Sequence, residues 1–151
     1  MGKAAGRTRR LARWAAWRRV AHQVSDDEWH EAAVATLSGL VASRHPLMTT
    51  NQVVGETYTL LRVTCGHAAA VAFLDRLEES RRVECIFVGK ELEARVYRLL
   101  RQYADQDFSF VDATSFAVMR SERIRHAFAL DQHFATAGFT RIPLDLSVAQ
   151  M

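Results

Sequence analysis

Three acidic residues stand out in this 151-residue chain because each lies in or beside an apolar stretch. Glu56 ends the segment 49–56, Asp112 lies inside the segment 108–119, and Asp131 follows an apolar run. An ionised carboxylate is costly to bury unless a cation or hydrogen-bond donors compensate it. Carboxylate oxygens are hard ligands of the kind that Mg²⁺ or Mn²⁺ prefers. The sequence therefore predicts a divalent-metal site formed by Glu56, Asp112 and Asp131.

Each of these acids also has an ordinary structural explanation. Glu56 would lie at the edge of the core, reaching water or pairing with Arg62. Asp112 fits the third helical position of a capping box that opens at Ser109, where it would also favour the positive end of the helix. Asp131 fits the N-cap of a short helix. Both hypotheses, metal ligand and structural acid, are open for each residue.

Other polar residues near these segments carry weaker signals. His133 is interpreted as a half-exposed surface or packing histidine, two residues after the third acid. Thr114 and Ser115 would add hydroxyls at the rim of the site, or would serve packing or capping. Asp105 and Asp107 are interpreted as loop or capping acids. The sequence holds no glycine-rich phosphate loop, no Ser–His–Asp pattern and no HExxH motif.

The elements that must position these acids follow from hydrophobic periodicity and turn residues. Strands alternate with helices along the chain, which predicts an α/β domain with a mainly parallel central sheet flanked by helices. Ligands bind beyond the carboxyl ends of such strands, where Asp131 falls. The predicted strands cover 47–50, 83–88, 126–130 and 140–144, and the predicted helices cover 26 to about 40, 51–65, 67–80, a stretch from about 90 through 100, 111–123 and 132–137.

Composition and charge narrow the class of protein. A chain with 49% hydrophobic and 25% charged residues is typical of one soluble globular domain, and no apolar run approaches the ~20 residues of a membrane span. The two cysteines, Cys65 and Cys85, show no metal or disulfide spacing and are interpreted as reduced packing residues. Residues 1–24 contain seven of the 20 Lys and Arg and no acid, which leaves 13 basic residues against 17 acids elsewhere. The basic pI near 9.2 therefore comes from one terminal segment.

Three hypotheses compete for this N-terminal segment. It would be a basic helix that contacts RNA or an acidic partner, a targeting peptide, or a segment foreign to the fold that arises from a displaced start or frame. We therefore divide the chain into a basic arm, residues 1–24, and a domain, residues 25–151. The arm is expected to pack poorly against the domain.

Three motifs in the domain resemble one known family. The segments TTNQVVGE (49–56), FSFVDATSFAVM (108–119) and ALDQHFATAGF (129–139) resemble the PIN-domain ribonuclease toxins of bacterial toxin–antitoxin pairs, the VapC-like proteins. The resemblance extends from about Asp26 to the C-terminus and rests on three motifs in the right order. It implies a three-layer PIN-like fold and a metal-dependent endoribonuclease.

The resemblance also implies ligands and partners. Glu56, Asp112 and Asp131 would bind one or two Mg²⁺ or Mn²⁺ ions, and the substrate would be a structured cellular RNA. A cognate antitoxin, a homodimer and a cytoplasmic location are implied as well. The family pattern opens with a buried strand that ends in a further metal-binding aspartate, and no such stretch precedes Asp26. The alternative is therefore a PIN-fold protein that binds antitoxin or RNA without cleaving, and we expect weak or absent cleavage from the chain as written.

Overall fold

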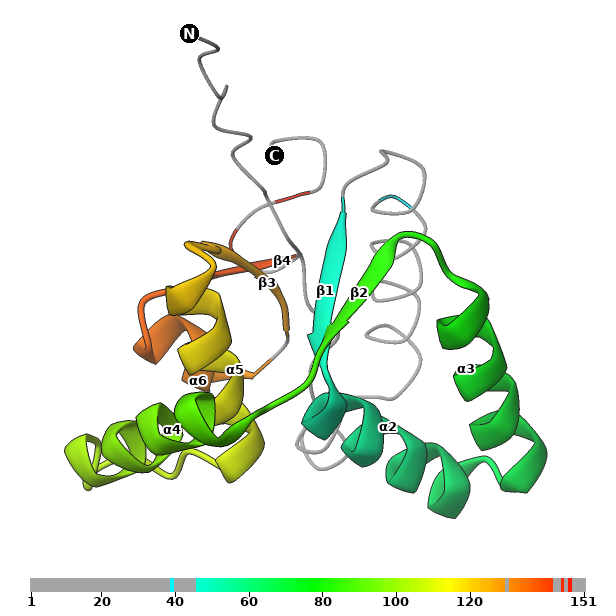
Figure 1. Ribbon diagram of the computed structural model, residues 1–151, viewed down its shortest axis with the longest axis horizontal. Helices are drawn as coiled ribbons and strands as arrows, with labels where there is room; N and C mark the ends of the chain where they lie inside the picture. The colour runs from blue at the N-terminus through cyan, green and yellow to red at the C-terminus, as the bar shows by residue number, and fades with distance from the viewer. Residues whose placement is uncertain (1–38, 40–45, 130, 143–144, 146, 148–151) are drawn as a thin grey trace, which may run out of the picture.

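The computed structural model of the protein describes residues 46–129 and 131–142, together with residues 39, 145 and 147. The basic arm and most of the helix predicted from residue 26 lie outside the described residues, so their packing stays a prediction. The described elements are, in chain order, β1 (Leu47–Thr50), α2 (Asn51–Thr64), α3 (His67–Glu79), β2 (Val83–Ile86), α4 (Lys90–Gln102), α5 (Phe110–Ser121), β3 (His126–Phe128), α6 (Gln132–Thr136) and β4 (Thr140–Ile142) (Figure 1).

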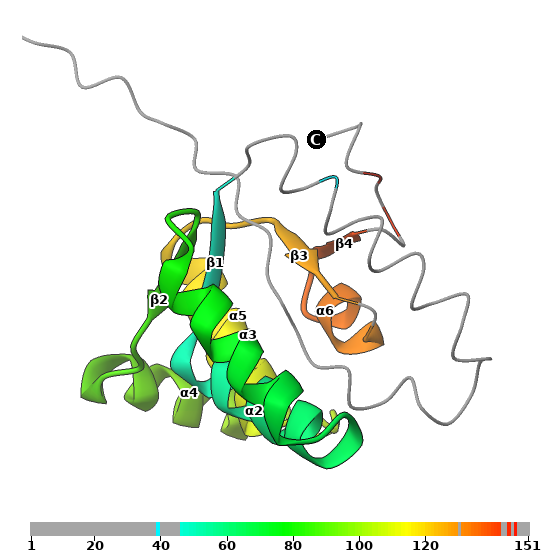
Figure 2. The same ribbon diagram turned by 90° about the vertical axis from the view of Figure 1, so that its right-hand side faces the viewer.

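The described strands form two parallel pairs. β1 pairs with β2, with Leu47 opposite Val83, and β3 pairs with β4, with Phe128 opposite Ile142. The parallel pairing confirms the α/β prediction, because parallel neighbours need the helical crossovers found here. The described strands are not joined in one continuous sheet, since they form two separate two-stranded sheets. Seen from the α3 side, β3, β4 and α6 stand together beside the rest of the described chain (Figure 2).

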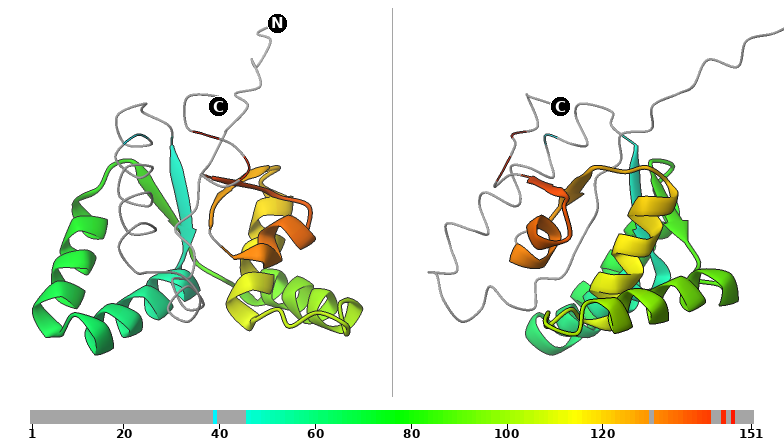
Figure 3. Two further views of the ribbon diagram at one scale, coloured as in Figure 1. Left: turned by 180° about the vertical axis from the view of Figure 1, so that it is seen from behind. Right: turned by 90° about the vertical axis from the view of Figure 1, so that its left-hand side faces the viewer.

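The helices divide between the two strand pairs. The hairpin of α2 and α3 lies on one side of β1 and β2, and the helices α4, α5 and α6 lie on the other (Figures 1 and 3). None of the described helices combines the length and apolarity that a membrane crossing requires. The molecule therefore has an α2–α3 half, which contains β1, β2, α2 and α3, and an α5–α6 half, which contains α4, α5, β3, α6 and β4.

Local hydrogen bonds explain where the α2–α3 half changes direction. The side chain of Thr50, the last residue of β1, accepts a hydrogen bond from the Val53 backbone at 3.2 Å and so caps α2. Gly66 separates α2 from α3 with φ of 91°, a conformation that glycine adopts without strain. The Asn51 side chain accepts a hydrogen bond from the Val88 backbone at 3.0 Å. This bond joins the carboxyl ends of β1 and β2.

The hydrophobic core is concentrated around α5. All residues of this helix from Val111 to Met119 are buried, so the helix is covered on every side. Phe116, which is fully buried, contacts Phe108, Phe134 and Phe139 at ring-centroid distances of 5.1, 5.0 and 5.6 Å. This aromatic cluster packs the loop before α5, the helix itself and α6 against one another. Offset and edge-to-face arrangements of this kind are the favourable geometries for aromatic pairs.

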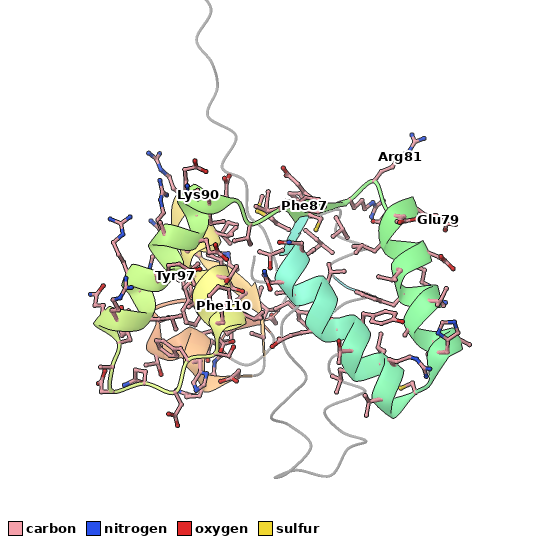
Figure 4. The ribbon with its side chains drawn as sticks, turned by 60° about the horizontal axis from the view of Figure 1, so that its bottom comes forward. Glu79, Arg81, Phe87, Lys90, Tyr97 and Phe110 are labelled. Atoms are coloured by element: carbon pink, nitrogen blue, oxygen red, sulfur yellow. The ribbon has the colours of Figure 1, made fainter. Side chains whose placement is uncertain are left out.

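Helix α4 covers one side of α5 and leaves its own polar side in solvent. Val96 and Leu99 of α4 are buried in the core. The rings of Tyr97 on α4 and Phe110 on α5 lie at a tilt of 55° with centroids 6.2 Å apart (Figure 4). Phe87, in the connection from β2 to α4, is 77% exposed (Figure 4). The contact between α4 and α5 therefore supports the N-terminal turn of α5, where Asp112 lies.

Candidate metal centre

Asp112 is fixed by the first turn of α5. The Ser109 hydroxyl accepts a hydrogen bond from the Asp112 backbone at 3.0 Å, and Asp112 Oδ2 accepts one from the Ser109 backbone at 3.0 Å. These two bonds form the capping box predicted from the sequence. Asp112 is only 4% exposed, so its carboxylate lies in the protein interior at the positive end of a helix.

Asp131 is fixed in a similar way at the start of α6. It is the N-cap of this helix, and its Oδ1 accepts a hydrogen bond from the His133 backbone at 2.8 Å. The capping role predicted for Asp131 is therefore confirmed. Capping does not exclude metal binding, because each carboxylate has two oxygens and each uses a single oxygen for its cap.

His133 connects the two acids. Its Nδ1 lies 3.1 Å from Asp112 Oδ2 and 3.5 Å from Asp131 Oδ1, and its side chain is 13% exposed. Its ring also packs edge-on against Phe108, with centroids 5.2 Å apart. Of the two roles predicted for His133, half-exposed surface residue or packing residue, the Phe108 contact supports the packing role. His133 is a member of the site that sequence reasoning did not assign, and its place two residues after Asp131 in the third motif was the signal available.

The two acids and the histidine form a compact group of potential ligands. One ligand atom from each of Asp112, Asp131 and His133 lies within 4.8 Å of the others. Ligand atoms that share one Mg²⁺ lie ~2.1 Å from the ion and so at most about 4.2 Å from each other. Asp112 Oδ1 and Asp131 Oδ2 accept no hydrogen bond from the part of the chain that the structure describes. The donor set therefore fits a hard divalent cation that keeps part of its water shell.

Glu56 lies apart from this group. It is half-buried in the second turn of α2, takes part in an interaction within the protein, and is absent from the group of Asp112, Asp131 and His133. Helix α2 begins at the carboxyl end of β1 and contacts α5. The structure thus brings two of the three predicted ligands together, and Glu56 stays a predicted ligand.

The hydroxyls of Thr114 and Ser115 serve the helix and not the rim of the site. Thr114 donates to the Phe110 carbonyl at 2.8 Å, and Ser115 donates to the Val111 carbonyl at 2.6 Å. Both side chains are buried, so the packing alternative for these residues holds.

Comparison with known proteins agrees with the family that the three motifs resemble. The model of the family described as PIN domain matches residues 20–140. A 114-residue region is 46% identical to the 23S rRNA-specific endonuclease VapC20 of Mycobacterium tuberculosis strains H37Rv and CDC 1551, and it covers 74% of this chain and 86% of the relative.

The three-dimensional comparison gives the same relative. The crystal structure of Mycobacterium tuberculosis VapC20, titled a Sarcin-Ricin loop cleaving toxin, matches with a TM-score of 0.64 and 45% identity. The match covers 72% of this chain and 83% of that one. These relatives are named as nucleases, which favours an enzyme over the binding-only alternative. The chain belongs to the PIN-domain family, among the VapC-like ribonuclease toxins.

Proposed function

We propose that this protein is a Mg²⁺-dependent endoribonuclease toxin that cuts a structured loop of ribosomal RNA. The observation that carries the proposal is the approach of Asp112 to Asp131, each with one carboxylate oxygen left over from helix capping. The relatives named for cleavage of 23S rRNA and of the sarcin–ricin loop support this class of substrate. Mn²⁺ would bind the same oxygens, since it shares the preference of Mg²⁺ for carboxylate and water.

The residues of the site would have different roles in metal and phosphate binding. Asp112 and Asp131 would hold the cation, and Glu56 on α2 would complete its carboxylate ligands. When bound, the ion supplies an activated water and stabilises negative charge on the scissile phosphate. The helix starts at Asp112 and Asp131 place positive dipole ends near this charge, so the backbone adds to the binding of phosphate.

The partners in this proposal follow from the same family. An antitoxin with a basic segment would neutralise the two carboxylates and so compete with the metal and the RNA. The toxin would act as a homodimer in the cytoplasm, where ribosomal RNA is found. A basic inhibitor would fit the site because Asp112 and Asp131 are acidic and Asp131 is partly exposed.

The direct test is cleavage of an RNA stem-loop of the sarcin–ricin type with Mg²⁺ present. Asp112→Asn removes the charge but keeps a side chain that caps helices well, so the variant should fold. Misplacing the metal by about 1 Å costs on the order of 10²-fold, so we expect at least that loss of rate. Asp107→Asn, an exposed residue in the preceding loop, is the matched control and should cleave normally.

Two outcomes would contradict the proposal. Cleavage that is indifferent to Asp112→Asn and to EDTA would assign the chemistry to other residues. RNA binding without any Mg²⁺-dependent cleavage by the unmodified chain would favour the binding-only alternative.

A further inference from the structure

His133 shares its contacts between both carboxylates of the metal centre. Its backbone N–H donates to Asp131 Oδ1 at 2.8 Å, and its ring Nδ1 lies 3.1 Å from Asp112 Oδ2. Asp112 comes from α5 and Asp131 from the start of α6, so His133 is the side chain that links these two helix starts. The edge contact of its ring with Phe108 fixes the direction of Nδ1.

These contacts assign the two oxygens of each carboxylate to different tasks. Asp112 Oδ2 accepts from the Ser109 backbone and lies in hydrogen-bond reach of His133 Nδ1, which leaves Oδ1 for a ligand. Asp131 Oδ1 accepts from the His133 backbone, which leaves Oδ2. Carboxylates that bind metals are commonly oriented by such outer hydrogen bonds.

We propose that His133 is a positioning residue that holds Asp112 beside Asp131 so that their remaining oxygens share one cation, and that it is not itself a metal ligand. This inference rests on the proposed function of the site. Nδ1 lies within hydrogen-bond reach of Asp112 Oδ2, and a carboxylate oxygen only accepts, so the positioning role uses the tautomer in which Nδ1 donates. In that tautomer Nδ1 has no lone pair for a metal, and Mg²⁺ prefers oxygen ligands to the remaining nitrogen, Nε2.

The positioning role predicts a measurable loss of metal affinity. Removal of an outer hydrogen-bond partner commonly weakens metal binding or activity by roughly 10–100-fold. Without the His133 donor, the two carboxylates lose the group between them that separates their negative charges. We therefore expect Mn²⁺ to bind at least tenfold more weakly, whether or not RNA is present.

Two substitutions separate the donor from the packing of the ring. His133→Asn places an amide N–H near the position of Nδ1 but removes the ring from Phe108. His133→Phe keeps the ring edge against Phe108 but removes the donor. The positioning role predicts that His133→Asn keeps most of the Mn²⁺ affinity and that His133→Phe loses it. His67→Ala, an exposed histidine at the start of α3, should bind Mn²⁺ as the unmodified protein does.

The measurement is Mn²⁺ binding by calorimetry on the full chain without RNA, with circular dichroism to establish that each variant is folded. Retained affinity in His133→Phe together with loss in His133→Asn would mean that the ring acts through packing, and would overturn the proposal. Strong ¹⁴N coupling in the pulsed EPR spectrum of bound Mn²⁺ would make His133 a direct ligand, and would overturn it too. If Asp112→Asn also leaves Mn²⁺ binding unchanged, the metal centre itself fails, which distinguishes that failure from a failure of His133 alone.

Discussion

The two halves of the molecule hold their acidic residues in different ways. In the α5–α6 half, Asp112 and Asp131 each accept a hydrogen bond from the backbone at the start of their helix. In the α2–α3 half, Glu56 lies within a helix, and its position depends on how α2 packs against α5. Local hydrogen bonds therefore fix two acids of the proposed site, whereas packing between helices must place the third.

Burial differs between the halves as well. Helix α5 has an unbroken buried stretch from Val111 to Met119, but Ala70 is the one residue of α3 that is described as buried. Among the described residues, the buried Thr49 hydroxyl of β1 has no hydrogen-bond partner, whereas the Thr114 hydroxyl bonds to a helix carbonyl. The α5–α6 half is thus more deeply buried than the α2–α3 half, and it contains the most constrained part of the proposed site.

The largest expected effect tests this difference in burial. Phe116→Ala should lower the free energy of unfolding by about 3–5 kcal/mol, because a fully buried ring leaves a cavity. Phe73→Ala in α3 removes a half-buried ring and should cost clearly less, roughly 1–2 kcal/mol. Urea unfolding followed by circular dichroism measures both values. Equal losses in the two variants would contradict the proposed difference between the halves.

The second prediction asks whether Glu56 joins the other acids. If packing brings Glu56 to the cation, Glu56→Gln should reduce Mg²⁺-dependent RNA cleavage at least tenfold, because the side chain keeps its size but loses its charge. The control is Glu79→Gln, an exposed residue at the end of α3. Cleavage rates at saturating RNA measure the effect, and a rate unchanged by Glu56→Gln would limit the ligands to the α5–α6 half.

The sequence predicts most element limits in both halves. The strand at 47–50 has the predicted limits, and the described helices have them within about two residues. The reason is that Thr50, Ser109, Asp131 and Gly66 are local start and stop signals. β2 ends at Ile86 and β3 at Phe128, each two residues before its predicted end. Capping also places Asp112 and Asp131 at the starts of their helices. The division of the described strands into two parallel pairs was not predictable in detail, because strand pairing depends on residues far apart in the chain.

The role of His133 illustrates what local signals miss. The sequence shows a histidine two residues after Asp131, and nothing in its spacing indicates a contact with Asp112, which lies 21 residues earlier. The contact arises because α6 folds back on the first turn of α5 through the cluster of Phe108, Phe116 and Phe134. Tertiary packing therefore determines the membership of the site, and local sequence determines its capping bonds.

A smaller expected effect on stability separates the two roles of Asp131, helix capping and metal binding. Asp131→Ala should lower the free energy of unfolding by about 1 kcal/mol, because α6 loses its N-cap. Asp131→Asn should keep the stability within a few tenths of a kcal/mol while RNA cleavage falls as in Asp112→Asn. Thermal unfolding and cleavage rates, measured on both variants, make the comparison. If both variants were equally destabilised, the side chain would serve the fold alone.

The smallest expected effect lies at the outer edge of the α5–α6 half, in the pair of Arg141 and Asp145. Arg141 Nη2 and Nε lie 2.8 and 3.0 Å from the Asp145 oxygens, and its Nη1 donates to Gln132 beside Asp131. Hydrogen bonds from Arg141 hold the pKa of Asp145 below its ordinary value. A lowered pKa means that the stabilisation is present above the ordinary carboxyl value of ~3.9 and is lost as the pH falls through the pKa of the folded state.

Asp145→Asn should therefore lower the free energy of unfolding by no more than about 1 kcal/mol at pH 7, because solvent screens a pair that is partly exposed. The difference from the unmodified protein should shrink as the pH falls below ~4, where the carboxyl in the unmodified protein becomes protonated. Urea unfolding at several pH values measures this, with Asp105→Asn in the loop before α5 as the control. RNA cleavage at neutral pH should change little, because the pair supports α6 from outside while the capping bonds of Asp131 and the contacts of His133 persist. A large loss of cleavage in Asp145→Asn would show that the start of α6 depends on this outer pair more than on its own cap.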